Sequence, residues 1–207
     1  MNEQITNEDL KEAHKKIYEL YQRDNQIVRI DWRQEKSIFF EKYNNVSVLT
    51  HDGLSLRHKI FKIIDEIEKI QEVFEENDKD EDEYIFQLEN FIFRSIQLRN
   101  ILLYFFKEGI QSFDEDRYIT VKEFFDKNFF LSQLKDTYRN ELTHKGYIFS
   151  IVHISDDKHC LLPKPIIYLP DQKLANEGTY EKWRKEWAYS IKYYLCLIKK
   201  LFDKILF

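Results

Sequence analysis

The segment from Arg139 to Lys145 holds the residues whose types and spacing best fit a chemical reaction. It reads Arg-Asn-Glu-Leu-Thr-His-Lys, so a guanidinium, an amide and an imidazole lie close together in the chain. An arginine can bind a phosphate through two parallel hydrogen bonds, and a histidine can transfer a proton near neutral pH. These two groups are sufficient for cleavage of RNA without a metal ion.

The spacing of Arg139 and His144 constrains the local structure. On an uninterrupted helix, two residues five positions apart differ by about 140° in direction around the axis and by about 7.5 Å along it. The side chains of Arg139 and His144 would therefore not meet. Gly146 suits a left-handed position just after the last helical turn, and we expect the chain to turn His144 back toward Arg139 there. The alternative is structural: Arg139 pairs with an acid, and His144 caps helix carbonyls.

Length and composition predict one folded domain over residues 1–207. With 43% hydrophobic residues, a chain of 207 residues can bury one sizeable core. No apolar run has the length of a signal peptide or a membrane span, so we expect a cytoplasmic protein that does not contact the membrane. Cys160 and Cys196 do not have the spacing of a metal-binding or redox pair. We therefore expect both cysteines to be reduced and to serve in packing.

Charge is distributed unevenly along the chain. The net charge of −5 argues against bulk binding of nucleic acid, and residues 65–89 hold twelve acids and two lysines. Residues 180–207 hold seven basic residues and three acids, interleaved with aromatic residues. Such a surface would suit single-stranded RNA, because bases stack on aromatic rings. The helical spacing of these aromatic residues favours the alternative that they belong to the core.

Apolar periodicity predicts four long helices. They cover Leu10–Leu20, Ile60–Phe74, Tyr84–Phe105 and the stretch from about Thr179 to the C-terminus. The third is apolar on most of its circumference, which predicts a central helix.

The remaining elements are shorter. Thr120 and Glu123 have capping-box spacing and predict the start of a shorter helix, followed by another that carries the motif. Two β-rich stretches, Tyr147–Ile154 and Leu161–Leu169, predict a hairpin. Residues 24–50 include apolar runs that could be extended. The expected fold is mainly α, a bundle of about four to six helices with a small appended β-hairpin near 147–169.

Two metal templates were tested and rejected. Residues 112–123 partly match a calcium loop, but the first acid is missing and Arg117 replaces the required glycine. His153, His159 and Cys160 could approach one another in the hairpin, but no fourth zinc ligand is evident. The sequence therefore predicts no metal and no cofactor.

The segment Arg139–His144, placed after a long apolar helix in a helical bundle, resembles the HEPN superfamily (higher eukaryotes and prokaryotes nucleotide-binding domain). The signature of that family is an arginine, a polar residue directly after it, and a histidine four to six intervening residues later. Here Asn140 is the polar residue, and four residues intervene. The resemblance covers about residues 80–207, and residues 1–79 form an N-terminal helical or irregular extension.

The resemblance implies a metal-independent endoribonuclease that acts as a homodimer, with the active site at the subunit interface. Such proteins often act as toxins or in abortive infection against phage, which implies an antitoxin or regulatory partner protein. His144 would act as general base or general acid, and Arg139 would stabilise the charge on the phosphorane. Asn140 would orient the substrate or the histidine, and Lys145 would bind a flanking RNA phosphate.

Two other classes of protein are also compatible with the sequence. The chain could be a catalytically inactive HEPN-like module that binds RNA or dimerises. It could also be a structural helical protein whose exposed aromatic residues are covered by a partner.

Overall fold

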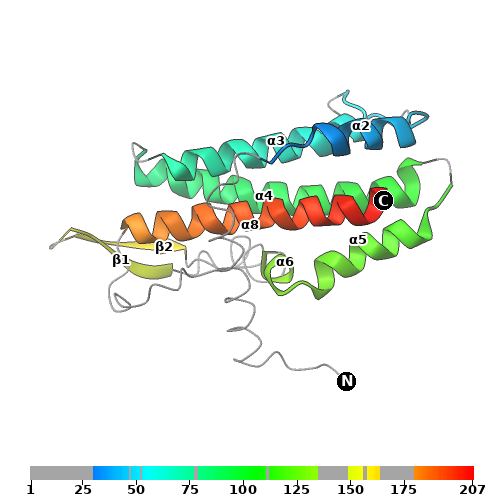
Figure 1. Ribbon diagram of the computed structural model, residues 1–207. Helices are drawn as coiled ribbons and strands as arrows, with labels where there is room; N and C mark the ends of the chain where they lie inside the picture. The colour runs from blue at the N-terminus through cyan, green and yellow to red at the C-terminus, as the bar shows by residue number, and fades with distance from the viewer. Residues whose placement is uncertain are drawn as a thin grey trace, which may run out of the picture.

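The protein is a bundle of helices with one small hairpin (Figure 1). The computed structural model describes residues 30–134, 149–163 and 180–207, except residues 47, 52, 77–78, 111 and 156–157. The mainly helical bundle expected from the sequence is confirmed. In chain order the elements, labelled as in Figure 1, are α2 (Arg33–Lys42), α3 (Leu56–Glu75), α4 (Glu81–Tyr104), the π-helix η1 (Phe105–Gly109), α5 (Glu115–Lys127), α6 (Phe129–Gln133), β1 (Phe149–Ser155), β2 (Lys158–Pro163) and α8 (Tyr180–Leu206).

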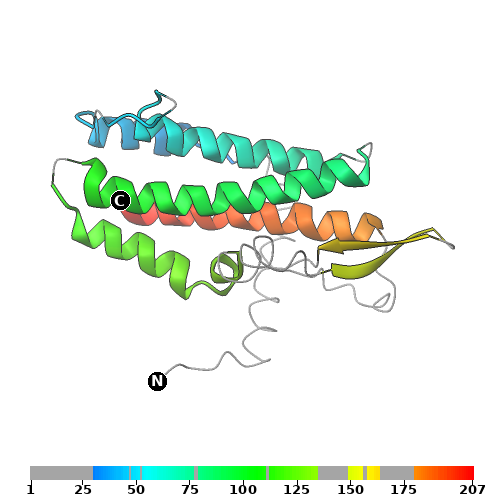
Figure 2. The ribbon, with the colours of Figure 1, turned by 180° about the vertical axis from the view of Figure 1, so that it is seen from behind.

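Three long helices, α3, α4 and α8, lie side by side and form the body of the bundle (Figures 1 and 2). α3 packs against both α4 and α8, and α2 packs against α8 and α3 near one end. α5 runs along the other side, where it contacts α4, η1 and α8. α8 therefore touches elements from every part of the described chain.

α3 shows how the apolar pattern produces this packing. Its first turn is capped by Ser55, whose hydroxyl accepts a hydrogen bond from the His58 amide. The stripe predicted from the sequence is buried, with Ile60, Ile63 and Phe74 each 0% exposed. Burial of each such side chain stabilises the fold by roughly 1.5–3 kcal/mol. No helix in the described ranges is long and apolar enough to cross a membrane.

An aromatic cluster joins α2 to the rest of the bundle. Phe39 of α2 is 0% exposed, and its ring centroid lies 4.9 Å from that of Tyr43 and 5.0 Å from that of Phe105. The rings of Phe61 in α3 and Phe202 in α8 lie 5.7 and 5.8 Å away. Centroid separations of roughly 4.5–7 Å are those of favourable aromatic pairs. One side chain thus connects α2, α3, η1 and α8.

The π-helix η1 continues α4 with a wider turn before the chain reverses into α5. The Asp114 amide donates a hydrogen bond to the Phe106 carbonyl at 3.0 Å, which fixes this reversal. Gly109 allows the close approach of α3, because a Cβ there would lie only 2.9 Å from the Leu56 Cδ1 atom. A larger residue at position 109 would therefore require Leu56 to move.

α5 begins five residues before the predicted start. Asp114 is its N-cap, and its carboxylate accepts a hydrogen bond from the Arg117 amide at 3.1 Å. Thr120 lies inside the helix, where its hydroxyl donates to the Asp116 carbonyl at 2.8 Å. The prediction of a helix start at Thr120 is wrong, because the threonine hydroxyl bonds back to the preceding turn rather than capping a new one.

The two strands form an antiparallel pair beside α8. The register places Phe149 opposite Pro163 and His153 opposite His159, with an irregularity between His153 and Ser155. β1 contacts α8. Both strands lie within the 147–169 range in which the sequence predicts a hairpin.

Candidate functional site

The catalytic motif predicted from the sequence lies outside the described residues. Arg139, Asn140, His144 and Lys145 all fall within residues 135–148. Their mutual arrangement, and the turn of His144 toward Arg139, therefore stay predictions. The amphipathic stretch Leu10–Leu20 also lies outside the described residues.

The described elements on either side of this segment both lie against α8. Before it, the ring of Phe130 in α6 packs edge-on against that of Tyr193 in α8, with centroids 5.3 Å apart, and Leu134 is buried. After it, β1 contacts α8. Figure 1 shows α6 and the hairpin on the same side of α8. The described elements that flank the motif segment in the chain therefore both contact α8.

The aromatic residues of α8 belong to the core. Trp183 and Trp187 are 2% and 0% exposed, and Tyr189 and Tyr194 are also buried. Phe91 of α4 contacts both Trp187 and Tyr194. Because these rings have no free face, they cannot stack on RNA bases, and the core interpretation of this helix is confirmed.

Two tyrosines of α8 are held in the neutral form. The Tyr194 hydroxyl donates a hydrogen bond to the Ser95 carbonyl at 3.2 Å, and burial raises the pKa of Tyr194. Burial also raises the pKa of Tyr193, although a hydrogen bond with the Asn128 side chain acts in the opposite direction. Neither phenol is suited to accept or release a proton near neutral pH.

Arg184, in the first turns of α8, fixes the end of α3. It is 5% exposed, and its Nη1 atom donates to the carbonyls of Phe74 at 2.5 Å and Glu76 at 2.8 Å. The Tyr84 hydroxyl donates to the same Glu76 carbonyl at 2.5 Å. Carbonyls at a helix C-terminus lack partners within the helix and carry partial negative charge. This buried arginine therefore has a structural role.

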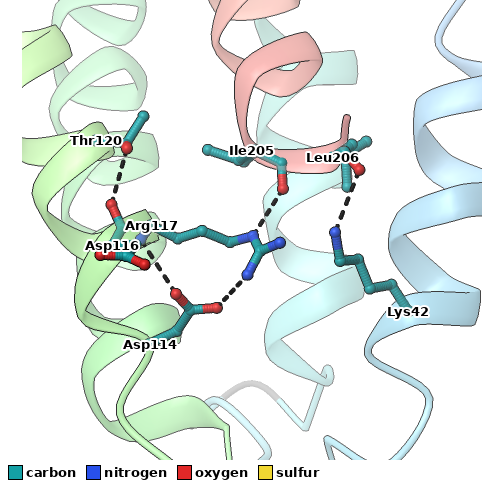
Figure 3. A network of polar contacts seen from close by, with 7 residues as sticks. All are labelled: Lys42, Asp114, Asp116, Arg117, Thr120, Ile205 and Leu206. Atoms are coloured by element: carbon teal, nitrogen blue, oxygen red, sulfur yellow. Dashed lines mark hydrogen bonds and ion pairs between the residues drawn. The ribbon is translucent and has the colours of Figure 1, made fainter.

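Two cations cap the C-terminus of α8 in the same way (Figure 3). The Arg117 Nε atom donates to the Ile205 carbonyl at 2.8 Å, and the Lys42 ammonium donates to the Leu206 carbonyl at 3.2 Å. Asp114 pairs with the Arg117 guanidinium at 2.5 Å. Burial lowers the pKa of Lys42, and the nearby Arg117 charge lowers it further.

These contacts explain one acid of the rejected calcium template. Asp114 caps α5 and pairs with Arg117, so its oxygens are used by the protein itself. In the described ranges no group of three or more His, Cys, Asp or Glu residues is arranged to hold a metal ion. Cys196 of α8 is partly exposed.

Sequence reasoning missed two buried acids at the α2 end of the bundle. Glu35 is 1% exposed and forms an ion pair with Lys199 of α8. Glu68 is 7% exposed and accepts a hydrogen bond from the Trp32 indole at 2.9 Å. The spacing of the residues could have revealed Glu35. This acid lies at helical intervals from Trp32 and Phe39, which places it on the apolar side of the helix.

Comparisons with known proteins found no matching family model, no matching curated protein and no matching solved structure.

Proposed function

We propose that this protein is a metal-independent endoribonuclease whose catalytic groups are Arg139 and His144. The observation that carries the proposal is the sequence motif itself: an arginine, a polar Asn140 and a histidine after four intervening residues, in a chain that folds mainly as a helical bundle. The bundle supports the proposal because it agrees with the fold that the HEPN resemblance implies.

The proposed reaction is an attack of the RNA 2′-hydroxyl on the adjacent phosphorus. A base removes the 2′ proton, the bond from phosphorus to the 5′ oxygen breaks, and an acid returns a proton to that oxygen. His144 performs one of these transfers, and Arg139 stabilises the charge on the phosphorane. Asn140 orients the substrate or the histidine, and Lys145 binds a flanking phosphate.

One motif supplies one histidine, whereas the reaction needs both a base and an acid. We therefore propose that two copies of the chain act together across a two-fold axis and contribute one His144 each to a shared cleft. The setting we propose is a cytoplasmic toxin or an effector of abortive infection, held inactive by an antitoxin or regulatory partner. No cofactor is required by this chemistry.

The test is cleavage of single-stranded RNA by the purified protein in excess chelator. The wild type should release 2′,3′-cyclic phosphate ends and should not cut at a 2′-deoxy substitution. His144→Ala and Arg139→Lys should each lower the rate by about 10²-fold or more, since lysine keeps the charge but loses the planar fork. His51→Ala, an exposed histidine in a loop, is the matched control.

Full activity of His144→Ala, or cleavage of the deoxy substrate, would overturn the proposal. Binding of RNA without cleavage by the wild type would instead favour the inactive RNA-binding module.

A further inference from the structure

The C-terminal end of α8 brings together two cations from separate elements. Lys42 is the last residue of α2, and Arg117 lies in the first turn of α5. The Lys42 ammonium donates to the Leu206 carbonyl at 3.2 Å. The Arg117 Nε atom donates to the preceding carbonyl, that of Ile205, at 2.8 Å. Two like charges are therefore held close together at one helix end.

One guanidinium nitrogen of Arg117 is available to a ligand. The Nε atom binds the α8 carbonyl, and the Nη1 atom pairs with Asp114. The Nη2 atom has no hydrogen-bond partner among the described residues, and Figure 3 shows it pointing toward the Lys42 side chain. The Arg117 side chain is 32% exposed, so a small anion can reach it. Guanidinium donors suit the oxygens of a phosphate.

The same arrangement favours the neutral form of Lys42. Partial burial lowers the pKa of Lys42, the positive charge of Arg117 lowers it further, and Asp114 acts in the opposite direction. The Lys42 side chain is nevertheless exposed, so a small reagent can reach its nitrogen. A neutral amine has a lone pair and is a nucleophile, whereas an ammonium is not. Lys42 thus places a nucleophile beside a phosphate-binding group.

We propose that Lys42 is a site of acylation by acyl phosphates, with Arg117 as the group that holds the phosphate. The Lys42 nitrogen forms a bond to the acyl carbon, and the bond from that carbon to the phosphate oxygen breaks. The electron pair of the broken bond leaves with the phosphate, which takes up the proton that the amine loses. The products are an amide on Lys42 and hydrogen phosphate. Arg117 stabilises the negative charge that grows on the leaving phosphate.

Other lysines of the bundle lack this combination because they pair with acids. A neighbouring acid stabilises the charged form of a lysine, and it also repels a phosphate. The described contact of the Lys42 ammonium is instead with a carbonyl. Acylation is therefore expected to be selective for Lys42 over the lysines of the pairs Lys107–Glu108, Lys127–Glu123 and Lys199–Glu35.

Acylation of Lys42 would change the end of α8. The ammonium becomes a neutral amide, so the Leu206 carbonyl loses a charged donor. The last turn of α8 and its attachment to α2 are then weakened. Neither Lys42 nor Arg117 belongs to the proposed catalytic motif, so this inference does not depend on RNA cleavage.

The first experiment compares two acyl donors on the full-length protein at about pH 8, where most lysines are charged. The donors are acetyl phosphate and N-acetoxysuccinimide, which has no phosphate, and mass spectrometry gives the initial rates at Lys42 and at the exposed Lys200. Acetyl phosphate should modify Lys42 about threefold or more faster than Lys200. The preference should be smaller with N-acetoxysuccinimide, because Arg117 then has no phosphate to hold. Equal rates with acetyl phosphate, or the same preference with both donors, would overturn the proposal.

Arg117→Met tests the phosphate-binding group. With acetyl phosphate it should lower the rate at Lys42, relative to that at Lys200, by about threefold or more. The matched control is Arg33→Met, because the Arg33 side chain is 91% exposed. Equal relative rates at Lys42 in the two variants would contradict the role of Arg117. The comparison of donors uses the wild type alone, so it decides the proposal even if Arg117→Met does not fold.

Hydrogen exchange after treatment with acetyl phosphate tests the consequence for α8. The last turn of α8 should exchange faster in the treated wild type than in treated Lys42→Arg, which keeps a charged cap and cannot be acylated at this position. Equal exchange in the two treated proteins would contradict the proposed effect on α8.

Discussion

Glu35 and Lys199 form an ion pair in which the carboxylate side chain is 1% exposed and the lysine side chain is 31% exposed. The second carboxylate oxygen of Glu35 has no hydrogen-bond partner among the described residues. The Glu35 carboxylate is therefore desolvated, whereas the side chain of Lys199, its ion-pair partner, stays partly hydrated. Such a pair is costly to break and adds little net stability when intact.

Lys199→Met should lower the free energy of unfolding by about 1–3 kcal/mol, because it leaves Glu35 buried without a cation. The double variant Glu35→Leu/Lys199→Met should recover most of this loss. Urea denaturation measures both, with Lys200→Met as the exposed control. A double variant less stable than Lys199→Met would show that the pair contributes net stability.

Phe39→Ala should lower the free energy of unfolding by about 3–5 kcal/mol, since it removes the ring that connects α2, α3, η1 and α8. Phe207→Ala removes the same side chain where it is 75% exposed, and should change stability by no more than about 0.5 kcal/mol. Thermal unfolding of both variants checks the contrast. Equal losses would mean that Phe39 is not central to the core.

Because the pKa of Tyr43 is raised, the protein should lose stability at alkaline pH. Burial raises the pKa of Tyr43 to about 12 from an ordinary value of 10.0. Between these values the unfolded chain has released the proton and the folded protein has not, so stability falls as the pH rises from 10 toward 12. The loss should be roughly 1–2 kcal/mol after allowance for partial solvation.

Tyr43→Phe isolates that contribution. The phenol oxygen has no hydrogen-bond partner among the described residues, so the variant should be about as stable as the wild type at pH 8. It should also lose stability less steeply between pH 10 and 12, as measured by urea titrations at several pH values. An unchanged slope would contradict the assignment to Tyr43.

Arg117→Met should destabilise the protein by about 1–2 kcal/mol, because the Ile205 carbonyl at the end of α8 loses a charged donor. Arg33→Met is the matched control, since that side chain is 91% exposed and pairs with Asp31 on the surface. Hydrogen exchange should show faster opening of the last turn of α8 in Arg117→Met only. Equal protection in both variants would contradict a capping role.

The long helices could be predicted because their apolar residues keep a helical period on a mostly polar background. Ile60–Phe74 and Tyr84–Phe105 match α3 and α4 to within a few residues, and the prediction of a helix from about Thr179 matches α8. α2 could not be predicted in this way. Its buried positions include Glu35, and an acid on the apolar side interrupts the pattern on which the prediction depends.

The start of α5 was misplaced because two local signals compete. Thr120 and Glu123 have capping-box spacing, but Asp114 already caps the helix six residues before Thr120. The predicted site, Arg139 and His144, depends on sequence spacing alone, since both residues lie outside the described ranges. Polar contacts between distant elements, such as Arg184 with the end of α3, leave no periodic signal in the sequence.

The position of α8 has a consequence for biosynthesis. Every other described element precedes α8 in the chain, yet α3, α4 and α2 all bury apolar residues against it. During translation these surfaces emerge first and stay uncovered while the segments from α5 to β2 are made. At roughly 5–20 residues per second this interval lasts several seconds. The nascent chain is thus exposed to chaperones and aggregation before its core can close.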